Sequence, residues 1–374
     1  MKTVFYGGSA IALAAMSGAP AMAQDVARND DSDTIRVEQQ LLTPAAGMLN
    51  DHMHEGGEVM IGLRFVRRVD SGTNQSGTSE ISDDQIFAAG FTARTQRMEM
   101  DMLMLDLMVA PSDDITLMVM PHYMWHRMDM RGIDPANTGM SEGGHGEGGH
   151  GESGHGGHGH GGIPFGMIAS HETHGFGDTL VSASYRLAKG PQLRAHATLG
   201  IWVPTGAVDR TNGDGTFVHY GMQPGSGTWD VEPAVTLAGK AGMMGWGAQA
   251  SYRWRTENAN ASGFAFGDVA RATGWVSYRL GSDFGATMRA EYQHEGQIVK
   301  HYNGPHNHSA PPDRQANYGG DPVQAGLGVN WAMPLGQSHR PQLGAEILLP
   351  VYQNLNGIQA PRKWSLALSL AQTF

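Results

Sequence analysis

The sequence has no cysteine, few charges and no long apolar run beyond its first residues. Without cysteine, no disulfide framework can staple the chain. Only 16% of the residues are charged and the formal net charge is −11, so nucleic acid is an unsuitable partner, because phosphate binding needs basic patches. No later apolar run could form a transmembrane helix. HExxH, P-loop and Rossmann motifs are also missing and no serine is marked as a nucleophile, so we expect no enzyme.

The N-terminus has the features of a cleaved secretory signal. Lys2 supplies a positive start, residues 4–16 are mostly apolar, and residues 21–23 form an A-x-A cleavage site. An uncleaved anchor is the alternative, but the apolar run is shorter than the about 18 residues that a spanning helix needs. We therefore expect export across the inner membrane, with a signal peptide at 1–23 and a periplasmic N-terminal tail or small plug at 24–57.

Apolar and polar residues alternate in segments of 10 or more residues, bounded by glycine, proline, asparagine and aspartate. Alternation at period 2 predicts a β-strand with one apolar face, and ~9–11 residues suffice for a tilted strand to cross a bilayer. The pattern predicts twelve strands, at 58–69, 97–110, 114–128, 176–188, 191–203, 227–239, 243–256, 267–280, 283–296, 321–333, 341–351 and 363–374.

The connections between these segments alternate in length. Short links such as 111–113 and 281–282 alternate with long ones at 70–96, 129–175, 204–226, 257–266, 297–320 and 352–362. A periplasmic β-sandwich would also have alternating strands, but it has no reason to alternate its loop lengths. The final segment ends in Phe374, like the C-terminal insertion signal of outer-membrane proteins. We predict an all-β fold, an antiparallel transmembrane β-barrel of about 12 strands over 58–374, with short periplasmic turns and long extracellular loops, in the outer membrane of a Gram-negative bacterium.

Several motifs resemble a known family. They are the run 51–60 (DHMHEGGEVM), Ala110-Pro111, the GFGD of 175–178, the WVPTG of 202–206, the GSGTWD of 225–230 and the LPVYQ of 349–353. Together they resemble proteobacterial outer-membrane barrels usually described only as transporters, which are related to barrels associated with the meta-pathway of phenol degradation. The resemblance covers most of the mature chain. It implies a transport barrel and supplies neither a substrate nor catalytic residues.

Two neighbouring strands place methionine on every second residue. Because the opposite face carries leucine, valine, tyrosine and tryptophan, the methionine face is expected to point into the lumen. Thioether sulfur is a soft ligand that selects Cu(I) or Ag(I), and cross-strand Met–Met or Met–His pairs could form weak two-coordinate sites. The alternative is that methionine fills an irregular interior. The candidate metal ligands are Met98, Met100, Met102, Met104, Met108, Met118, Met120, His122, Met124, His126 and Met128.

Histidine gathers in the expected extracellular loops. The tract 143–162 is almost only Gly, His, Glu and Ser, which predicts a disordered loop, and His-rich tracts bind Zn(II), Cu(II) and Ni(II). A solvated spacer loop is the alternative. The candidate ligands are His145, His150, His155, His158 and His160, with a second cluster at His301, His306 and His308 and a weaker one at His52 and His54.

Charged residues share the inward parity on most strands, because arginine on the lipid face at mid-membrane costs about 2–4 kcal/mol. They could fill a narrow barrel as ion pairs, the interpretation we favour, or form a selectivity lining. The residues expected to line the lumen are Arg64, Arg186, Arg194, Arg253, Arg255, Arg289, Asp230, Glu232 and Glu291.

The sequence alone therefore favours an outer-membrane channel or transport barrel, with binding or passage of a soft, copper-like metal as its specific form. A channel for small organic or aromatic compounds and a non-transporting metal-binding or structural barrel stay open. We expect no required cofactor, although Cu(I), Cu(II) or Zn(II) could bind. The expected partners are outer-membrane lipid, metal ions or small solutes, and the barrel assembly machinery during insertion, with no nucleic acid.

Overall fold

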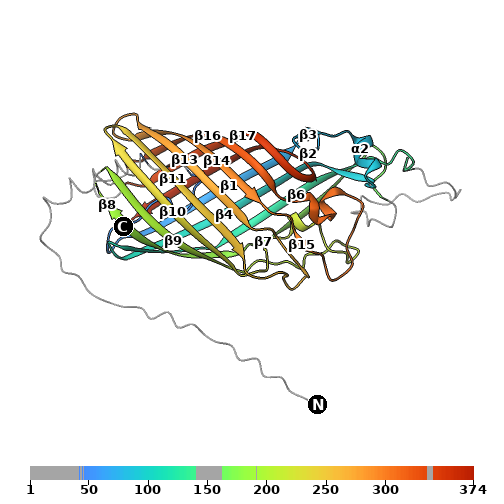
Figure 1. Cartoon of the computed structure of the whole chain (residues 1–374), viewed down its shortest axis with the longest axis horizontal. Helices are drawn as coiled ribbons and strands as arrows, with labels where there is room; N and C mark the ends of the chain where they lie inside the picture. The colour runs from blue at the N-terminus through green and yellow to red at the C-terminus, as the bar shows by residue number, and fades with distance from the viewer. Residues whose placement is uncertain (1–41, 43, 45, 140–161, 191, 335–339) are drawn as a thin grey trace, which may run out of the picture.

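The computed structural model describes residues 42, 44, 46–139, 162–190, 192–334 and 340–374. Within them the chain forms a closed antiparallel β-barrel with strongly tilted strands (Figure 1). The first strand, β1 (Val59–Ser71), pairs with β4 (Ala93–Ser112) on one side and with the last strand, β18 (Arg362–Thr373), on the other, and this pairing closes the barrel.

The wall contains fourteen hydrogen-bonded strand segments. Two pairs of these segments continue one another, so the barrel has twelve transmembrane strands, each of which we call a stave. This confirms the predicted strand number. Besides β1, β4 and β18, the staves are β5 (Ile115–Met120) continued by β6 (His122–Gly132), β7 (Ile168–Phe176) continued by β8 (Thr179–Lys189), β9 (Leu193–Val203), β10 (Asp230–Ala241), β11 (Met244–Arg255), β13 (Val269–Arg279), β14 (Phe284–Glu295), β16 (Gly320–Ala332) and β17 (Gln342–Gln359).

Two neighbouring staves are interrupted at the same level along the barrel axis. Pro121, which has no backbone N–H to donate to the ladder, separates β5 from β6. On the adjacent stave Gly177 and Asp178 separate β7 from β8, and the Gly177 N–H donates to the carbonyl of His122. Among the described strands β7 pairs only with β6, because the chain leaves the sheet after β9 at Val203.

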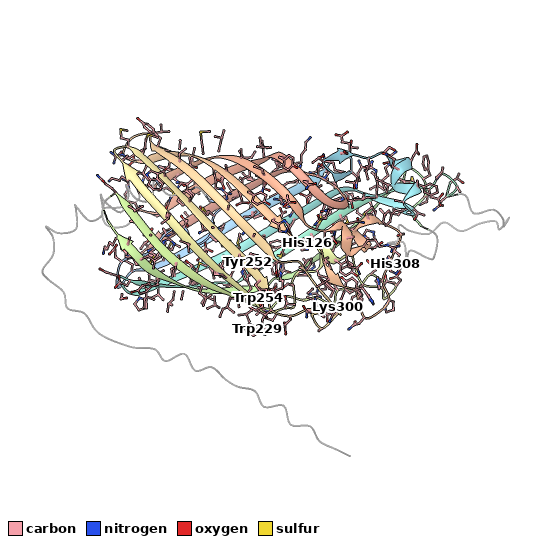
Figure 2. All side chains as sticks on the ribbon, viewed as in Figure 1. His126, Trp229, Tyr252, Trp254, Lys300 and His308 are labelled. Carbon is pink, nitrogen blue, oxygen red and sulfur yellow. The ribbon has the colours of Figure 1, made fainter. Side chains whose placement is uncertain are left out.

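The two faces of β4 have the predicted chemistry in its membrane-spanning part. On β4, Leu105 and Leu107 are 38% and 39% exposed, whereas Met104 and Asp106 are 5% and 4% exposed. Aliphatic side chains therefore face the lipid, and methionine and charged residues face the lumen. Figure 2 shows Trp229, Tyr252 and Trp254 near the end of the barrel where β10 and β11 meet the loops, where aromatic residues favour the membrane interface.

Several strands reach further toward the extracellular side than the sequence predicts. The segment 352–362 was expected to be a loop, but β17 continues to Gln359 and only residues 360–361 separate it from β18. Likewise β4 begins at Ala93 and β7 at Ile168, inside two of the expected loops. Beyond the lipid the end of β17 pairs with the short segment 75–77, and the starts of β4 and β7 both pair with β6, where no apolar environment imposes alternation. In β17 the residues from Gln353 onward are all partly buried.

Small elements cover the extracellular end, opposite the short turns and the C-terminus (Figure 1). They are β2 (Gln75–Gly77), β3 (Ser79–Glu80), α2 (Asp83–Ala88), β12 (Phe264–Ala265), β15 (Val299–Lys300) and the 3-10 turns η1 (Tyr220–Met222), η2 (Pro311–Asp313) and η3 (Gln315–Asn317). The ring of Tyr302 stacks between Phe217 and Tyr220, with centroids 4.3 Å apart on both sides. This aromatic packing joins loops 204–229 and 296–319 over the lumen. No helix among the described residues is both long and apolar enough to cross a membrane.

Candidate lumenal chamber

Methionine and histidine from β4 and β5/β6 face each other across the strand pairing, in a set that we call the Met/His ladder. The register places Met98 opposite Met128, Met100 opposite His126, Met102 opposite Met124, Met104 opposite His122, and Met108 opposite Met118. Directly opposed residues have Cβ atoms about 4.5–5.5 Å apart, so each pair can share a contact. The predicted inward parity of these residues is correct. Met120 lies on the same face and is fully buried.

The residues that precede β1 lie inside the barrel. The carbonyl of Asn50 accepts hydrogen bonds from Nε2 of His196 at 2.9 Å and from Nε2 of Gln249 at 3.1 Å. The guanidinium of Arg64 donates to the carbonyls of Ala46 and Met48. Residues 46–57 thus fill the periplasmic part of the lumen, and we call them the plug segment.

The plug segment is also attached to the periplasmic rim. The N–H of Gly56 donates to Oδ1 of Asp113 at 2.9 Å, in the turn between β4 and β5, and Nζ of Lys189 lies 3.1 Å from Oδ2 of the same carboxylate. Both partners favour the charged carboxylate, and they hold the pKa of Asp113 below its usual value. Lys189 also reaches Glu55 of the plug segment at 2.5 Å.

The plug segment divides the Met/His ladder into two halves with different surroundings. In the periplasmic half, Leu49 packs against a buried apolar cluster. That cluster consists of Met60, Met104, Met108, Met118, Met120, Leu180 and Trp202. Here methionine is packing material around the plug segment, as the filling alternative predicts. The extracellular half of the ladder lies beyond this cluster.

The extracellular half of the ladder lines a chamber of about 430 Å³ in the lumen. Figure 2 shows His126 of this half of the ladder within the barrel, toward the end that carries the loops. One part of the chamber wall is formed by Met98, Met100, Met102, His122, Met124, His126 and Met128. Another part is rich in arginine, with Arg68, Arg253, Arg255, Arg271 and Arg362 beside Asp70 and Glu295. Trp202, Phe266 and Tyr318 add aromatic surface. The chamber therefore offers apolar, aromatic and cationic contacts together.

The inward charges are held in ion pairs. Arg289 binds Glu346 through two hydrogen bonds of 2.9 and 2.7 Å and Glu291 through one of 2.8 Å. Further pairs join Arg64 to Asp106, Arg253 to Glu232 and Arg255 to Asp230. This geometry agrees with the ion-pair interpretation of the lumenal charges.

Four of the six predicted lumenal arginines, Arg64, Arg186, Arg194 and Arg289, do not line the chamber. Arg186 and Arg194 line a second cavity, of about 290 Å³, at the periplasmic end together with Asp51 and His52 of the plug segment. Arg186 also donates to the carbonyl of His54, at 3.0 Å. These two arginines therefore belong to the surroundings of the plug segment.

Of the two predicted extracellular histidine clusters, the structure describes the one at His301, His306 and His308. The ring of His306 packs edge-on against that of His308, with centroids 4.5 Å apart, and His301 stacks on His306 at 6.2 Å. Burial and the neighbouring His306 hold the pKa of His308 below its usual value. Within the described ranges no three His, Asp or Glu side chains converge as metal ligands. The predicted ligands His145, His150, His155, His158 and His160 lie outside the described residues.

Sequence reasoning missed some chamber residues. Arg68 shares the parity of Arg64 on β1, so the alternation could have identified it. Phe266 and Tyr318 lie in loops, where no periodicity shows which way a side chain points. Trp202 has the inward parity, but the stacking of the Arg253 guanidinium 3.5 Å from its ring centre is a tertiary contact that no local pattern reveals.

Comparisons with known proteins agree with this geometry. The family model described as "Putative MetA-pathway of phenol degradation" matches residues 136–337, or 202 of 374 residues. No curated protein matches the chain in sequence. The structure of an outer membrane channel from Pseudomonas putida F1 superimposes with a TM-score of 0.54 at 13% identity, covering 87% of this chain and 99% of that chain.

Two other solved structures superimpose with lower TM-scores. The transport unit of the autotransporter AIDA-I from Escherichia coli has a TM-score of 0.42 at 8% identity, covering 92% of this chain and 98% of that chain. The P. putida toluene transporter TodX has a TM-score of 0.35 at 9% identity, covering 86% and 90%. The family match confirms the resemblance seen in the sequence motifs. The chain is thus an outer-membrane β-barrel and belongs to the family of the MetA-pathway of phenol degradation.

Proposed function

We propose that this barrel passes small aromatic compounds and binds them in the chamber on their way through the lumen. The observation that carries the proposal is a chamber of about 430 Å³ with mixed apolar, aromatic and cationic walls. An apolar cavity of about 150 Å³ is already large enough to bind benzene. The chamber therefore has room for one small aromatic molecule with polar substituents.

The wall chemistry suits such a solute. Methionine sulfur makes favourable contacts with aromatic rings, and a guanidinium packs over a ring face. Arg253 already packs in this way over Trp202. A hydroxyl or carboxylate on the solute would find donors among the arginines. The phenol-degradation family name and the toluene transporter among the structural neighbours support this class of solute without identifying one.

Uptake into liposomes tests the proposal. The purified barrel should admit phenol and benzoate faster than a sugar of similar size. Met102→Trp, which fills the chamber, should slow this uptake several-fold. Leu105→Trp on the lipid face of the same strand is the matched control and should change nothing. Equal rates for aromatic compounds and sugars, or equal uptake by the two variants, would contradict the proposal.

Handling of a soft metal, the leading hypothesis from the sequence, is the second candidate. The comparisons lend it no support, and one structural observation favours it, the direct opposition of methionine and histidine across β4 and β6. The Gly/His-rich tract 143–162 stays a proposed collector of Zn(II) or Cu(II), to be tested by the metal content of cells that carry its deletion. We propose these metals as cargo and not as a required cofactor.

A further inference from the structure

Part of the extracellular half of the Met/His ladder differs from packing material, although Met128 is buried in a second apolar cluster against which Met98 packs. Met100 and Met102 are only partly buried and border the chamber, whereas Met104 and Met108 are buried against the plug segment. Methionine that serves only as filler would be surrounded by other side chains. Met100 and Met102, with Met124 opposite Met102, instead line the chamber, although Met124 is 8% exposed and Met102 also packs against the periplasmic cluster.

His122 supplies a second observation that points to a ligand. Its side chain is 7% exposed and lines the chamber, and no described residue gives its ring Nδ1 a hydrogen-bond partner. A buried polar atom without a partner costs about 1–3 kcal/mol. His126 in the same ladder contacts Oγ1 of Thr173 through its Nδ1 at 3.4 Å and hydrogen-bonds the backbone of Met222. The His122 imidazole therefore borders the thioethers with coordinating capacity left over.

The donor set defines the class of ion. Thioether and neutral imidazole are uncharged soft or borderline ligands, which select Cu(I) and Ag(I) over hard cations. The nearby carboxylates are already engaged, Asp70 by Arg68 at 2.6 Å and Asp178 by the N–H and hydroxyl of Ser226 at 2.8 and 2.6 Å. The ligands therefore cannot neutralise a dication, whereas a monovalent soft ion needs only two or three of them.

We propose that Met102 and Met124, joined either by His122 from the next rung or by Met100 and His126 from the previous rung, form a binding site for one soft monovalent cation, Cu(I) or Ag(I), in the chamber wall. The site goes beyond the passage of aromatic compounds and does not depend on it. Opposed residues on β4 and β6 lie about 4.5–5.5 Å apart and successive inward residues about 6.6–6.8 Å apart, so flexible thioethers from two rungs can reach one ion.

Silver titration of the whole purified barrel tests the site. Ag(I) is the probe because it does not change its oxidation state, and the ¹³C-labelled methionine methyl groups report each sulfur separately by NMR. We expect the Met102 and Met124 methyl signals to shift on addition of Ag(I), and those of Met108 and Met118 to stay in place. Zn(II) at the same concentration should not move the first group.

Variants complete the test. The triple change Met100→Leu, Met102→Leu and Met124→Leu keeps apolar volume and removes the sulfurs, and should weaken Ag(I) binding about tenfold or more. The control is Met288→Leu with Met244→Leu, two residues exposed on the lipid face, which should bind as the original chain does. Equal binding by the triple variant, or shifts confined to Met108 and Met118, would overturn the site. Aromatic uptake measured on the same variants reports separately on the proposed passage.

Discussion

At the scale of single residues, both partners of one ion pair are buried away from water. Arg289 of β14 and Glu346 of β17 are 4% and 1% exposed and share two hydrogen bonds over the intervening strand β16. Gly47 of the plug segment lies directly above this pair, and a Cβ atom there would meet Oε2 of Glu346 at 2.2 Å. The plug segment thus packs directly against this ion pair on the inner face of the barrel wall.

Breaking this pair on one side leaves the buried Arg289 guanidinium with Glu291 as its remaining charged partner. We expect Glu346→Gln to lower the free energy of unfolding by about 1–3 kcal/mol, measured by urea unfolding in lipid vesicles. The double change Arg289→Met with Glu346→Leu should recover most of this loss because it removes both charges. A single variant as stable as the original barrel would contradict this account.

Gly177 is required by the position of a ladder histidine. A Cβ atom at residue 177 would lie 2.0 Å from Nε2 of His122. We expect Gly177→Ala to displace the imidazole, destabilise the barrel by about 1–3 kcal/mol and weaken Ag(I) binding. Gly213→Ala, at a glycine with no neighbour within 4 Å, is the control and should do neither. Unchanged stability and unchanged silver binding in Gly177→Ala would show that the ring is not held there.

The carboxylate that fastens the plug segment responds to pH. The pKa of Asp113 is lowered in the folded barrel, chiefly by the Gly56 N–H and Lys189. Its contribution is therefore fully present above the ordinary aspartate pKa of about 3.9 and is lost as the pH falls through the lowered value. The stability difference between the original chain and Asp113→Asn should be measurable at pH 6 and vanish in strong acid. A difference that grows on acidification would refute this assignment.

At the scale of elements, the strands could be predicted from the sequence and the plug segment could not be placed. Lipid on one face and lumen on the other impose alternation over residues such as 193–203, so the strand shows in the sequence. Residues 46–57 bond mainly through their backbone carbonyls, as Asn50 does, and backbone groups leave no side-chain pattern. The extracellular part of β17 was missed because neither of its faces contacts lipid.

Filling of the lumen by the plug segment has a measurable consequence. Deleting residues 46–55 removes the carbonyls bound by Arg64, His196 and Gln249 and should raise the single-channel conductance several-fold. Deletion of residues 26–35, of the same length, is the control for shortening the chain. Conductance that is the same with and without the plug segment would show that the restriction lies elsewhere.

At the scale of the whole molecule, the barrel presents an apolar surface to lipid and a polar one to the lumen. The loss of stability caused by a charged residue on the lipid face should therefore depend on its depth in the membrane. Leu199 lies near the middle of β9 and faces outward, and Leu193 starts the same strand at the periplasmic end. We expect Leu199→Arg to destabilise the barrel by about 2–4 kcal/mol and Leu193→Arg by about 0–1 kcal/mol. Urea unfolding in lipid vesicles measures both, and equal costs would contradict the assigned membrane position.

The interruptions at Pro121 and at Gly177–Asp178 bear on the mechanics of the wall. A barrel is stiff because its hydrogen-bond ladder runs unbroken around the circumference, and here two adjacent staves lose ladder bonds at one height. Above that height β7 has a strand partner on one side only among the described strands. Bending of the extracellular end against the periplasmic end should concentrate along this line. His122 lies on it, so the most compliant part of the wall is also the part that shapes the chamber.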